Sequence, residues 1–253
     1  MIPFTIIIPV FAETGALAFS SFYFRQLGLE PLYVLDSKKA ARLGEVESIV
    51  GRPVAIYDNP GPYIEAHYER LAALSPTDWI LRVDCDEVPN TRMLDYCQRF
   101  VDAPRDAYCG FERDDLTWRG DHFERVKQPF LFIDSQYRLF NRKRVTFVQT
   151  IHTPGFIRPK WKLPLVPLWH APLPARLYHL QRAFISAEEH HEKFARYAAA
   201  GQDGKFNAQM QRQDEATQWR PFHDQTFTSL FAEWQAGARI NPPSDATIKR
   251  RKN

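Results

Sequence analysis

Cysteine is scarce in this sequence. The three cysteines, Cys85, Cys97 and Cys109, are an odd number, and their spacing fits neither a zinc site nor a disulfide framework. We therefore expect reduced thiols without a redox or metal-binding role.

Long hydrophobic runs are also missing. The longest apolar stretches, such as "TIIIPVF" and "LPLVPLW", are far shorter than the roughly 20 residues that a membrane-spanning helix needs. The N-terminal residues lack the basic region and the long apolar segment of a signal peptide. We therefore expect a cytoplasmic protein. Its 44% of hydrophobic residues, in a chain of 253, are enough for one large buried core.

A strong charge excess is absent as well. The net charge is only +3, and much of it lies in the closing residues "IKRRKN". We interpret this segment as a solvated, mobile tail, which is also compatible with a weak peripheral contact to the inner face of a membrane. A nucleic-acid-binding protein needs a basic face with aromatic residues, whereas the pattern described below is acidic. We therefore expect no nucleic-acid partner.

What the sequence does contain is a regular alternation of strands and helices over its first ninety residues. Short apolar or β-branched runs are each followed by a segment with helical spacing. Strands separated by helices predict an α/β fold with a mainly parallel sheet that is covered on both faces. The expected strands are 4–11, 31–36, 53–59 and 78–84, and the expected helices are 15–28, 37–51, 62–75 and 91–100.

Acidic and amide side chains follow each of the expected strands. Glu13 follows the first, Asp36 the second, Asp58 and Asn59 the third, and Asp84 the fourth. Open α/β sheets bind their ligands beyond the carboxyl ends of the strands. A row of hydrogen-bond acceptors there suits the hydroxyls of a ribose and the N–H groups of a base. For Asp36 or Asp58 alone, a helix-capping or turn role is an equally good interpretation.

The segment "DCDEVPN", residues 84–90, places three carboxylates within four positions. Side chains two apart on a strand point the same way, so Asp84 and Asp86 are predicted to share one face while Cys85 turns toward the fold. Mg²⁺ and Mn²⁺ prefer oxygen ligands, and Mg²⁺ commonly takes one or two carboxylates together with substrate phosphates. The pattern therefore predicts a divalent-metal site. The alternative is an acidic turn that caps the helix over 91–100 through Asn90.

Four segments taken together resemble a known family. "TIIIPVFAETG", "YVLDS", "AIYDN" and "WILRVDCDEVP" are similar to the nucleotide-binding half of family 2 glycosyltransferases, which have the GT-A fold. The resemblance covers residues 4–90. Later segments, such as "YRLFNRKRVTF", "IHTPG" and "LYHLQRAFISAEEHHEKFARY", look like the later part of related small bacterial enzymes. The resemblance implies a Rossmann-like sheet flanked by helices and followed by a less regular acceptor-side region.

The resemblance also implies site residues. Phe11 and Glu13 would border the nucleotide, and Asp36 and Asp58 would contact its ribose or base. The metal ion, Mn²⁺ or Mg²⁺, would be held with the diphosphate. The nucleotide-sugar contacts predicted in this way are Pro9, Phe11, Glu13, Asp36, Asp58, Asn59, Asp84, Arg138 and His152, and the predicted metal ligands are Asp84, Asp86 and His179.

The sequence departs from the family pattern at several points. Ala12 replaces the asparagine that usually precedes the glutamate of the first loop, and Asp36 is followed by Ser37 instead of a second aspartate. The usual acidic pair that supplies the catalytic base has no clear counterpart. The preferred nucleotide base and the stereochemical course therefore stay open.

A catalytic base and a histidine ligand must be sought in the second half of the chain. Asp114 and Asp115 in "GFERDDLTWRG" are the candidate bases, with an exposed acidic turn as the alternative. His152 and His179 both lie where the resemblance implies a residue near the metal or the diphosphate. We assign His179 to the metal and His152 to the diphosphate or the acceptor, with an ordinary core or surface role as the alternative. Arg138 could hold phosphate, and the alternative for it is part of a basic hairpin tip.

The domain organisation follows from the same patterns. We predict one GT-A domain over residues 1–200, with a nucleotide-binding half over 1–90 and an acceptor-side half over 91–200. The proline-rich, aromatic segment 153–174 is the predicted acceptor site, or else a loop fixed to the core. Residues 201–218, rich in Gln, Asp and Gly, are interpreted as a linker or a mobile lid. Phe227, Phe231 and Trp234 then recur at helical spacing and are expected to pack on the domain or on a second subunit.

These observations favour a metal-dependent glycosyltransferase. It would transfer a sugar from a nucleotide-sugar donor to a hydroxyl of a carbohydrate or glycolipid acceptor, in cell-surface polysaccharide or lipopolysaccharide synthesis. One alternative is a degenerate relative that binds the donor without catalysis. The other is a nucleotidyltransferase, which is expected to carry a glycine-rich, basic loop after its first strand, whereas "PVFAETGAL" has one glycine and no Lys or Arg.

Overall fold

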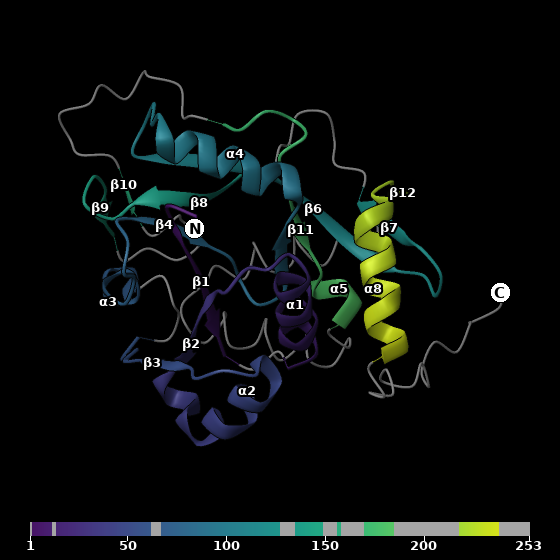
Figure 1. The fold of residues 1–253 in the computed structure, drawn as a ribbon, viewed down its shortest axis with the longest axis horizontal. Coiled ribbons are helices and arrows are strands. Elements are labelled where there is room, and N and C mark those ends of the chain that lie inside the picture. Colours follow the sequence, from purple (N-terminus) through teal and green to yellow (C-terminus); the bar gives the residue numbers. More distant parts are fainter. Residues whose placement is uncertain are drawn as a thin grey trace.

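A mixed sheet of ten strands runs through the protein (Figure 1). The structure is a computed structural model that describes residues 2–11, 14–61, 67–126, 135–148, 156–157, 170–184 and 218–237. The strands are β1 Thr5–Val10, β2 Leu32–Asp36, β3 Ala55–Tyr57, β4 Trp79–Arg82, β5 Glu87–Pro89, β6 Tyr108–Trp118, β7 Phe123–Val126, β8 Ser135–Asn141, β9 Thr146–Phe147, β10 Phe156–Ile157, β11 Arg176–His179 and β12 Trp219–Pro221.

The order of these strands separates a parallel half from a mainly antiparallel half, in which β11 runs parallel to β6. Neighbours follow the order β12-β7-β6-β8-β4-β1-β2-β3, β11 joins β5 to β6, and β9 pairs with β10 in a small separate sheet. The helices are α1 Thr14–Gln26, the 3₁₀ helix η1 Ser37–Arg42, α2 Leu43–Val50, α3 Tyr68–Ala73, α4 Thr91–Asp102, α5 Gln181–Phe184 and α8 Gln225–Gly237.

The four N-terminal strands are parallel, as the sequence predicts. β2 and β4 pair with β1 on its two sides, and β3 extends the sheet beyond β2. β8 pairs antiparallel with both β4 and β6, and β7 and β12 continue that half. A parallel core flanked by helices confirms the predicted α/β fold class. The antiparallel half of the sheet was not predicted, apart from the basic hairpin that was the alternative for Arg138.

Alternating side chains of β1 divide the core into two layers. Ile6 and Ile8 belong to the larger cluster, which also contains residues of α1, α2, α4 and α8, whereas Ile7 belongs to the cluster on the opposite face with α3. A strand that is buried on both faces has a continuous apolar sequence, as "TIIIPV" does. Because helices cover both faces, the carboxyl edge is the part of the sheet that can receive a ligand.

Local signals place several helix ends where the sequence predicts them. Asn90 caps α4, because its Oδ1 accepts a hydrogen bond from the backbone N–H of Met93 at 2.8 Å. Gly51 ends α2 with φ of 71°, a conformation that favours glycine. Asp36 caps η1 through the N–H of Lys38. The single helix expected over 37–51 is divided into η1 and α2, because Arg42 leaves the helical region where the two meet, and Lys39 is a further non-helical residue inside η1.

Two further boundaries differ from the prediction. The strand expected over 78–84 ends at Arg82, and the chain then turns, with the Glu87 N–H donating to the Asp84 carbonyl at 2.9 Å. The strand alternation expected for Asp84 and Asp86 is therefore wrong, although Cys85 is buried in the core as expected. The helix expected over 62–75 is seen from Tyr68, and residues 62–66 lie outside the described part.

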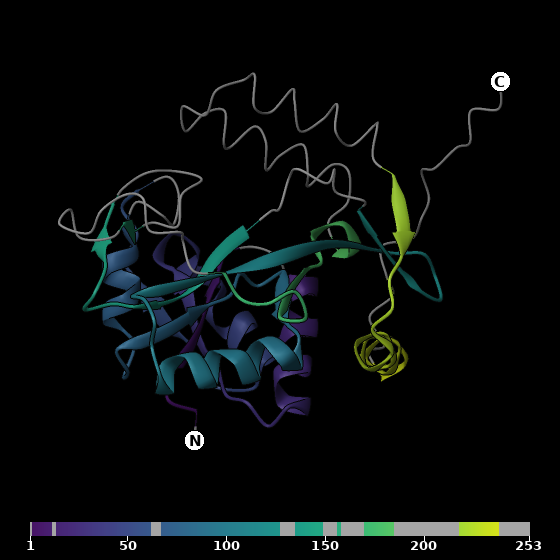
Figure 2. The ribbon, with the colours of Figure 1, turned by 90° about the horizontal axis from the view of Figure 1, so that it is seen from above.

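The C-terminal helix packs on the domain, which confirms that prediction. Phe227 and Phe231 of α8 lie against Phe19 of α1 and Phe123 of β7, with ring centroids 4.7 to 5.8 Å apart. β12 pairs with β7 just before this helix. Figure 2 shows α8 end-on, close to β12 and β7. Residues 218–237 therefore share one core with the N-terminal strands, whereas the boundary predicted at residue 200 and the predicted tail lie outside the described residues.

The helices of the described residues are short. None of them is both long enough and apolar enough to cross a membrane.

Candidate functional site

Several of the predicted site residues lie at the carboxyl ends of β1, β2, β3 and β4, and Figure 1 shows where these strands lie in the sheet. Phe11 follows β1, Asp36 ends β2, Asn59 follows β3 and Asp84 follows β4. This edge is formed as predicted, because the four strands are parallel neighbours. Glu13 and His152, and with them most of the predicted acceptor segment, lie outside the described residues.

Asp36 and Asn59 form a buried pair across the ends of β2 and β3. Asn59 Nδ2 donates to Asp36 Oδ2 at 2.6 Å, while Asp36 Oδ1 accepts the backbone N–H of Lys38 at 2.9 Å. Buried polar groups need such partners, since an unpaired one loses its hydrogen bonds to water. The capping interpretation of Asp36 is therefore confirmed. The same carboxylate also fixes Asn59 at the edge that is predicted to bind the nucleotide.

The other predicted nucleotide contacts are less closely grouped. The Asp58 side chain is 79% exposed and pairs with Arg70 of α3 at 2.6 Å. Pro9 lies within β1 opposite Val34 of β2. The Phe11 ring has Lys39 Nζ 4.7 Å from its centroid. The structure thus places Phe11 and Asp36 at one edge and turns Asp58 outward, and the nucleotide contacts of all these residues stay predictions.

Two arginines hold the Asp84 carboxylate. Arg138 Nη2, from β8, lies 2.7 Å from Asp84 Oδ2, and Arg82 Nη1, from the end of β4, lies 3.4 Å from Oδ1. Arg138 was predicted to contact phosphate, and its side chain is only 3% exposed. Its observed partners are carboxylates, so a phosphate contact of Arg138 stays a prediction.

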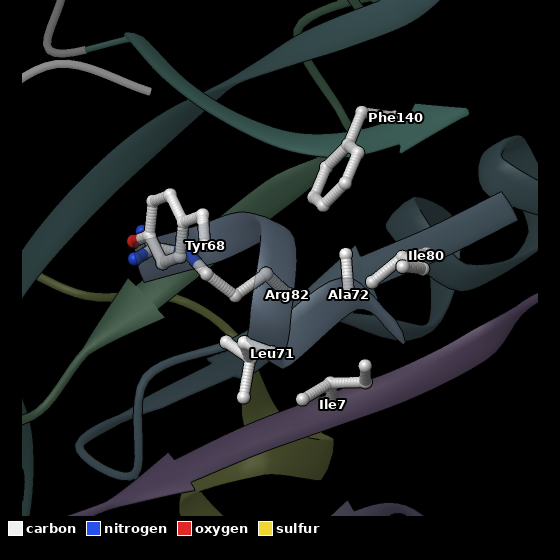
Figure 3. Close-up of a pocket in the computed structure, with 7 residues that line it drawn as sticks. All are labelled: Ile7, Tyr68, Leu71, Ala72, Ile80, Arg82 and Phe140. Atoms are coloured by element: carbon white, nitrogen blue, oxygen red, sulfur yellow. The ribbon is translucent and has the colours of Figure 1, made fainter. Parts of the chain in front are cut away.

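Arg82 connects Asp84 to a narrow cavity on the α3 face of the sheet. Its guanidinium lies over the Tyr68 ring, 4.9 Å from the centroid. Figure 3 shows the Tyr68 hydroxyl and the Arg82 guanidinium at the same end of the cavity, turned away from the apolar side chains of Ile7, Ile80 and Phe140. The cavity is lined mainly by core side chains, and the Arg82 guanidinium beside it reaches the Asp84 carboxylate.

Glu87 is the most buried of the three clustered carboxylates, with 1% of its side chain exposed. Its Oε1 accepts a hydrogen bond from Arg138 Nη2 at 2.5 Å, and its Oε2 accepts the backbone N–H of Asp84 at 3.2 Å. Burial and then the neighbouring Asp84 carboxylate raise the pKa of Glu87 to about 8. Sequence reasoning gave Glu87 no role of its own. The only signal was its place directly after Asp86.

Glu87, His179 and Asp115 form a row across three strands. In β11, His179 is the register partner of Glu87 in β5 and of Asp115 in β6. Register partners lie on the same face of a sheet. His179 Nδ1 lies 2.5 Å from Asp115 Oδ1, and its Nε2 lies 3.4 Å from Asp86 Oδ2. His179 is therefore held between two carboxylates.

The surroundings of His179 set its protonation. Burial and Arg113 lower the pKa of His179, but Asp86 and Asp115 outweigh them and raise it from 6.5 to about 9. Burial raises the pKa of Asp115, yet Arg113 and the hydrogen bond from His179 outweigh burial and hold it below its ordinary value. With no cation bound, His179 is protonated at neutral pH and its Nδ1–H donates to an ionised Asp115; a cation at Nε2 would displace the proton from that nitrogen.

The two candidate bases have different surroundings. Asp114 and Asp115 are consecutive in β6, so their side chains leave opposite faces of the strand. Asp114 lies 3.5 Å from Arg125 and 3.7 Å from Arg176, and burial raises its pKa. The alternative of an exposed acidic turn is wrong, because both residues lie inside a strand and are partly buried. The catalytic role of either one stays a prediction.

The predicted metal ligands are only partly brought together. Asp86 and His179 meet, whereas Asp84 is paired with arginines. Among the described residues, no group of three or more His, Cys, Asp or Glu side chains is spaced to hold a metal ion. Two protein ligands suffice for Mg²⁺ when phosphate and water supply the rest. A metal-binding histidine typically donates a hydrogen bond from its other ring nitrogen to a carboxylate, as His179 Nδ1 does to Asp115. The donors therefore fit a divalent cation that is shared with a phosphate ligand.

Comparisons with known proteins give structural neighbours only. No model of a protein family matches the sequence. A comparison with curated proteins also finds no match. Among solved structures, HddC from Yersinia pseudotuberculosis is 11% identical with a TM-score of 0.44, over 76% of this chain and 99% of that chain. HddC was also solved with GMP-PN.

Two further solved structures are also similar in fold. TarS from S. aureus is 13% identical with a TM-score of 0.41, over 98% of this chain and 46% of that chain, so this chain spans about half the length of TarS. A CMP:2-keto-3-deoxy-manno-octonic acid synthetase complexed with CTP is 10% identical with a TM-score of 0.35, over 55% of this chain and 74% of that chain. At these values the similarities concern the fold alone.

Proposed function

We propose that the protein is a metal-dependent glycosyltransferase that moves a sugar from a nucleotide-sugar donor to a hydroxyl of a carbohydrate or glycolipid acceptor. The observation that carries this proposal is the meeting of Asp86 and His179 beside Asp84, at the sheet edge where Asp36 and Asn59 also lie. The choice of reaction and of acceptor class rests on the resemblance of the motifs to family 2 glycosyltransferases.

Different residues at the edge would contact the nucleoside and the diphosphate of the donor. The Asp36–Asn59 pair and Phe11 border the nucleoside, for which a buried carboxylate, an amide and an aromatic ring are suitable partners. Asp86 and His179 hold Mn²⁺ or Mg²⁺, and Asp115 keeps the His179 ring in one orientation. The cation, when bound, supplies positive charge to the diphosphate leaving group.

An inverting reaction also needs a base for the acceptor hydroxyl. Asp114 and Asp115 remain the candidates. Asp115 already accepts a hydrogen bond from His179, and two arginines contact Asp114. Each candidate base would therefore act from within an existing ion-pair network.

The test is a panel of common sugar nucleotides, each with and without Mn²⁺, read first by thermal shift and then by release of nucleoside diphosphate. A ligand that binds only the folded state raises the melting temperature by mass action. We expect one donor to stabilise the protein only when Mn²⁺ is present, and to be turned over when an acceptor is supplied.

Other outcomes separate the alternatives. Binding of a donor without any release of nucleoside diphosphate, across acceptors, would favour a degenerate binding module. Release of pyrophosphate from a nucleoside triphosphate and a sugar phosphate would favour a nucleotidyltransferase. The absence of any shift at millimolar donor with Mn²⁺ would overturn the proposal.

A further inference from the structure

Glu87 links two parts of the site that are far apart in the sequence. Its side chain accepts a hydrogen bond from Arg138 of β8, and the same Arg138 nitrogen contacts the Asp84 carboxylate. Two hydrogen bonds also connect Glu87 with the backbone of Asp84. Its Oε2 accepts the Asp84 N–H at 3.2 Å, and its own N–H donates to the Asp84 carbonyl at 2.9 Å.

These contacts occupy both carboxylate oxygens of Glu87. Oε1 faces Arg138, with Arg113 Nη1 at 3.7 Å, and Oε2 faces the backbone of Asp84. With 1% of the side chain exposed, Glu87 is poorly placed to ligate a cation itself. Its action on the edge is therefore indirect, through the groups that it holds.

The geometry of the turn depends on this support. Asp84, Asp86 and Glu87 place three carboxyl groups within four residues, and repulsion among the ionised ones favours an open turn unless cations and hydrogen bonds offset it. The buried Arg138 guanidinium offsets it with a nitrogen shared between two carboxylates. The turn also meets β11, since the Leu180 N–H donates to the Asp86 carbonyl at 2.7 Å. A displaced Glu87 would thus move both Asp84 and Asp86.

We propose that Glu87 is a positioning residue, which sets the geometry of the 84–87 turn and of Arg138 and thereby the affinity of the edge for a divalent cation. This inference rests on the proposed function and adds a residue that touches neither donor nor cation. The property that matters is the length of the Glu87 side chain, because both of its oxygens make contacts that a shorter side chain cannot reach.

The experiment separates the effect of the length of the Glu87 side chain from the effect of its carboxyl group. Glu87→Asp keeps the carboxyl group and withdraws it by one methylene, whereas Glu87→Gln keeps the length and an oxygen acceptor. The dissociation constant for Mn²⁺ alone is measured by electron paramagnetic resonance on the full chain. We expect Glu87→Asp to weaken Mn²⁺ binding about 10-fold or more, as loss of an outer support typically does, and Glu87→Gln to weaken it less.

A matched control excludes a general effect of shortening a paired glutamate. Glu124 of β7 pairs with Arg119 at 2.7 Å, and within the described part of the chain no hydrogen bond or ion pair joins it to the site residues named above. Glu124→Asp is expected to bind Mn²⁺ as the wild type does. A second readout separates positioning from a merely structural role: excess Mn²⁺ should restore the turnover of Glu87→Asp, because the lost step is cation binding.

The outcomes are distinct. Wild-type affinity in Glu87→Asp, or equal weakening in Glu124→Asp, would overturn the positioning role while leaving the proposed function in place. A wild type that binds no Mn²⁺ would overturn the metal-dependent function and this inference together. If Glu87→Asp does not fold, Mn²⁺ binding is measured on Arg138→Lys instead. A lysine keeps the positive charge but lacks the planar guanidinium that contacts both Asp84 and Glu87. Unchanged Mn²⁺ affinity in that variant would also overturn the inference.

Discussion

Asp86 is the side chain on which the proposed chemistry depends most. Its carboxylate lies 3.4 Å from His179 Nε2, and asparagine in its place keeps the volume but loses the charge that attracts a cation. We predict that Asp86→Asn lowers Mn²⁺-dependent release of nucleoside diphosphate by about 100-fold, at the upper end of what perturbing a metal site costs. Steady-state kinetics over a range of Mn²⁺ concentrations measures this loss.

The matched control for this prediction is Asp95→Asn, which makes the same change at an exposed position of α4. It should leave turnover unchanged. Circular dichroism of both variants should show folded protein. Full activity of a folded Asp86→Asn at low Mn²⁺ would show that the cation, if one is used, binds elsewhere.

Single residues were predictable where the signal is local. Asn90 stands directly before a helix and caps it, and Asp36 ends a strand and caps the following turn. His179 was favoured as a site residue only through the family resemblance. Its neighbours Asp115 and Glu87 come from strands 64 and 92 positions away in the chain, counted from residue 179, and no local pattern specifies that pairing. The contact of Arg138 with Asp84 is equally long-range.

Among the elements, α8 is the one whose docking can be tested most directly. Phe231 is 1% exposed and has ring contacts with Phe19 and Trp118 at 4.9 Å and with Phe123 at 4.7 Å. Removing a buried phenyl group forfeits its transfer free energy and leaves a cavity. We predict that Phe231→Ala lowers the free energy of unfolding by about 3–5 kcal/mol. Urea denaturation followed by tryptophan fluorescence measures this change.

The comparison for α8 is Ser229→Ala, an exposed position of the same helix. Its effect should lie within about 0.5 kcal/mol. A loss below about 1 kcal/mol in Phe231→Ala would contradict the packing of α8 on β7 and α1.

The elements themselves were largely predictable in the first half of the chain. Apolar runs of five or six residues separated by helical spacing specify β1, β2 and their crossover helices, because each pattern reflects the local environment of one element. Pairing in the second half is mostly antiparallel, with β11 parallel to β6, and it joins segments that have no repeating pattern. The end of β4 was also misplaced, since Asp84 turns to meet Glu87 and Arg138, and these tertiary contacts override strand periodicity.

At the scale of the whole molecule, one buried cluster connects the site to most of the described elements. It includes Phe4 before β1, Cys85 in the turn between Asp84 and Asp86, and Phe231 of α8. The acidic turn is thus anchored in the same core that α8 completes. The edge residues keep their geometry because the core beneath them is shared, so a change in global stability reaches the site as well.

The cysteines report on that shared core. All three are free and buried in it, which confirms the expectation of reduced thiols. Burial raises the pKa of Cys109 from 9.0 to about 12, and it raises the pKa of Cys97 as well. Reaction with a thiol reagent needs both access and a thiolate, so the folded protein should be unreactive at pH 8.

We therefore predict that labelling of the three thiols at pH 8 requires unfolding and becomes faster with urea, in step with the loss of circular dichroism. The sign of the pH effect follows from the raised pKa. The Cys109 thiol favours the folded state fully below about pH 9, and this contribution is lost as the pH rises through 12, so the free energy of unfolding should fall over that range. Time-resolved reaction with a chromogenic disulfide, with mass spectrometry to locate each label, makes the measurement. Rapid labelling of Cys85 alone in native buffer would show instead that the acidic turn opens independently of the core.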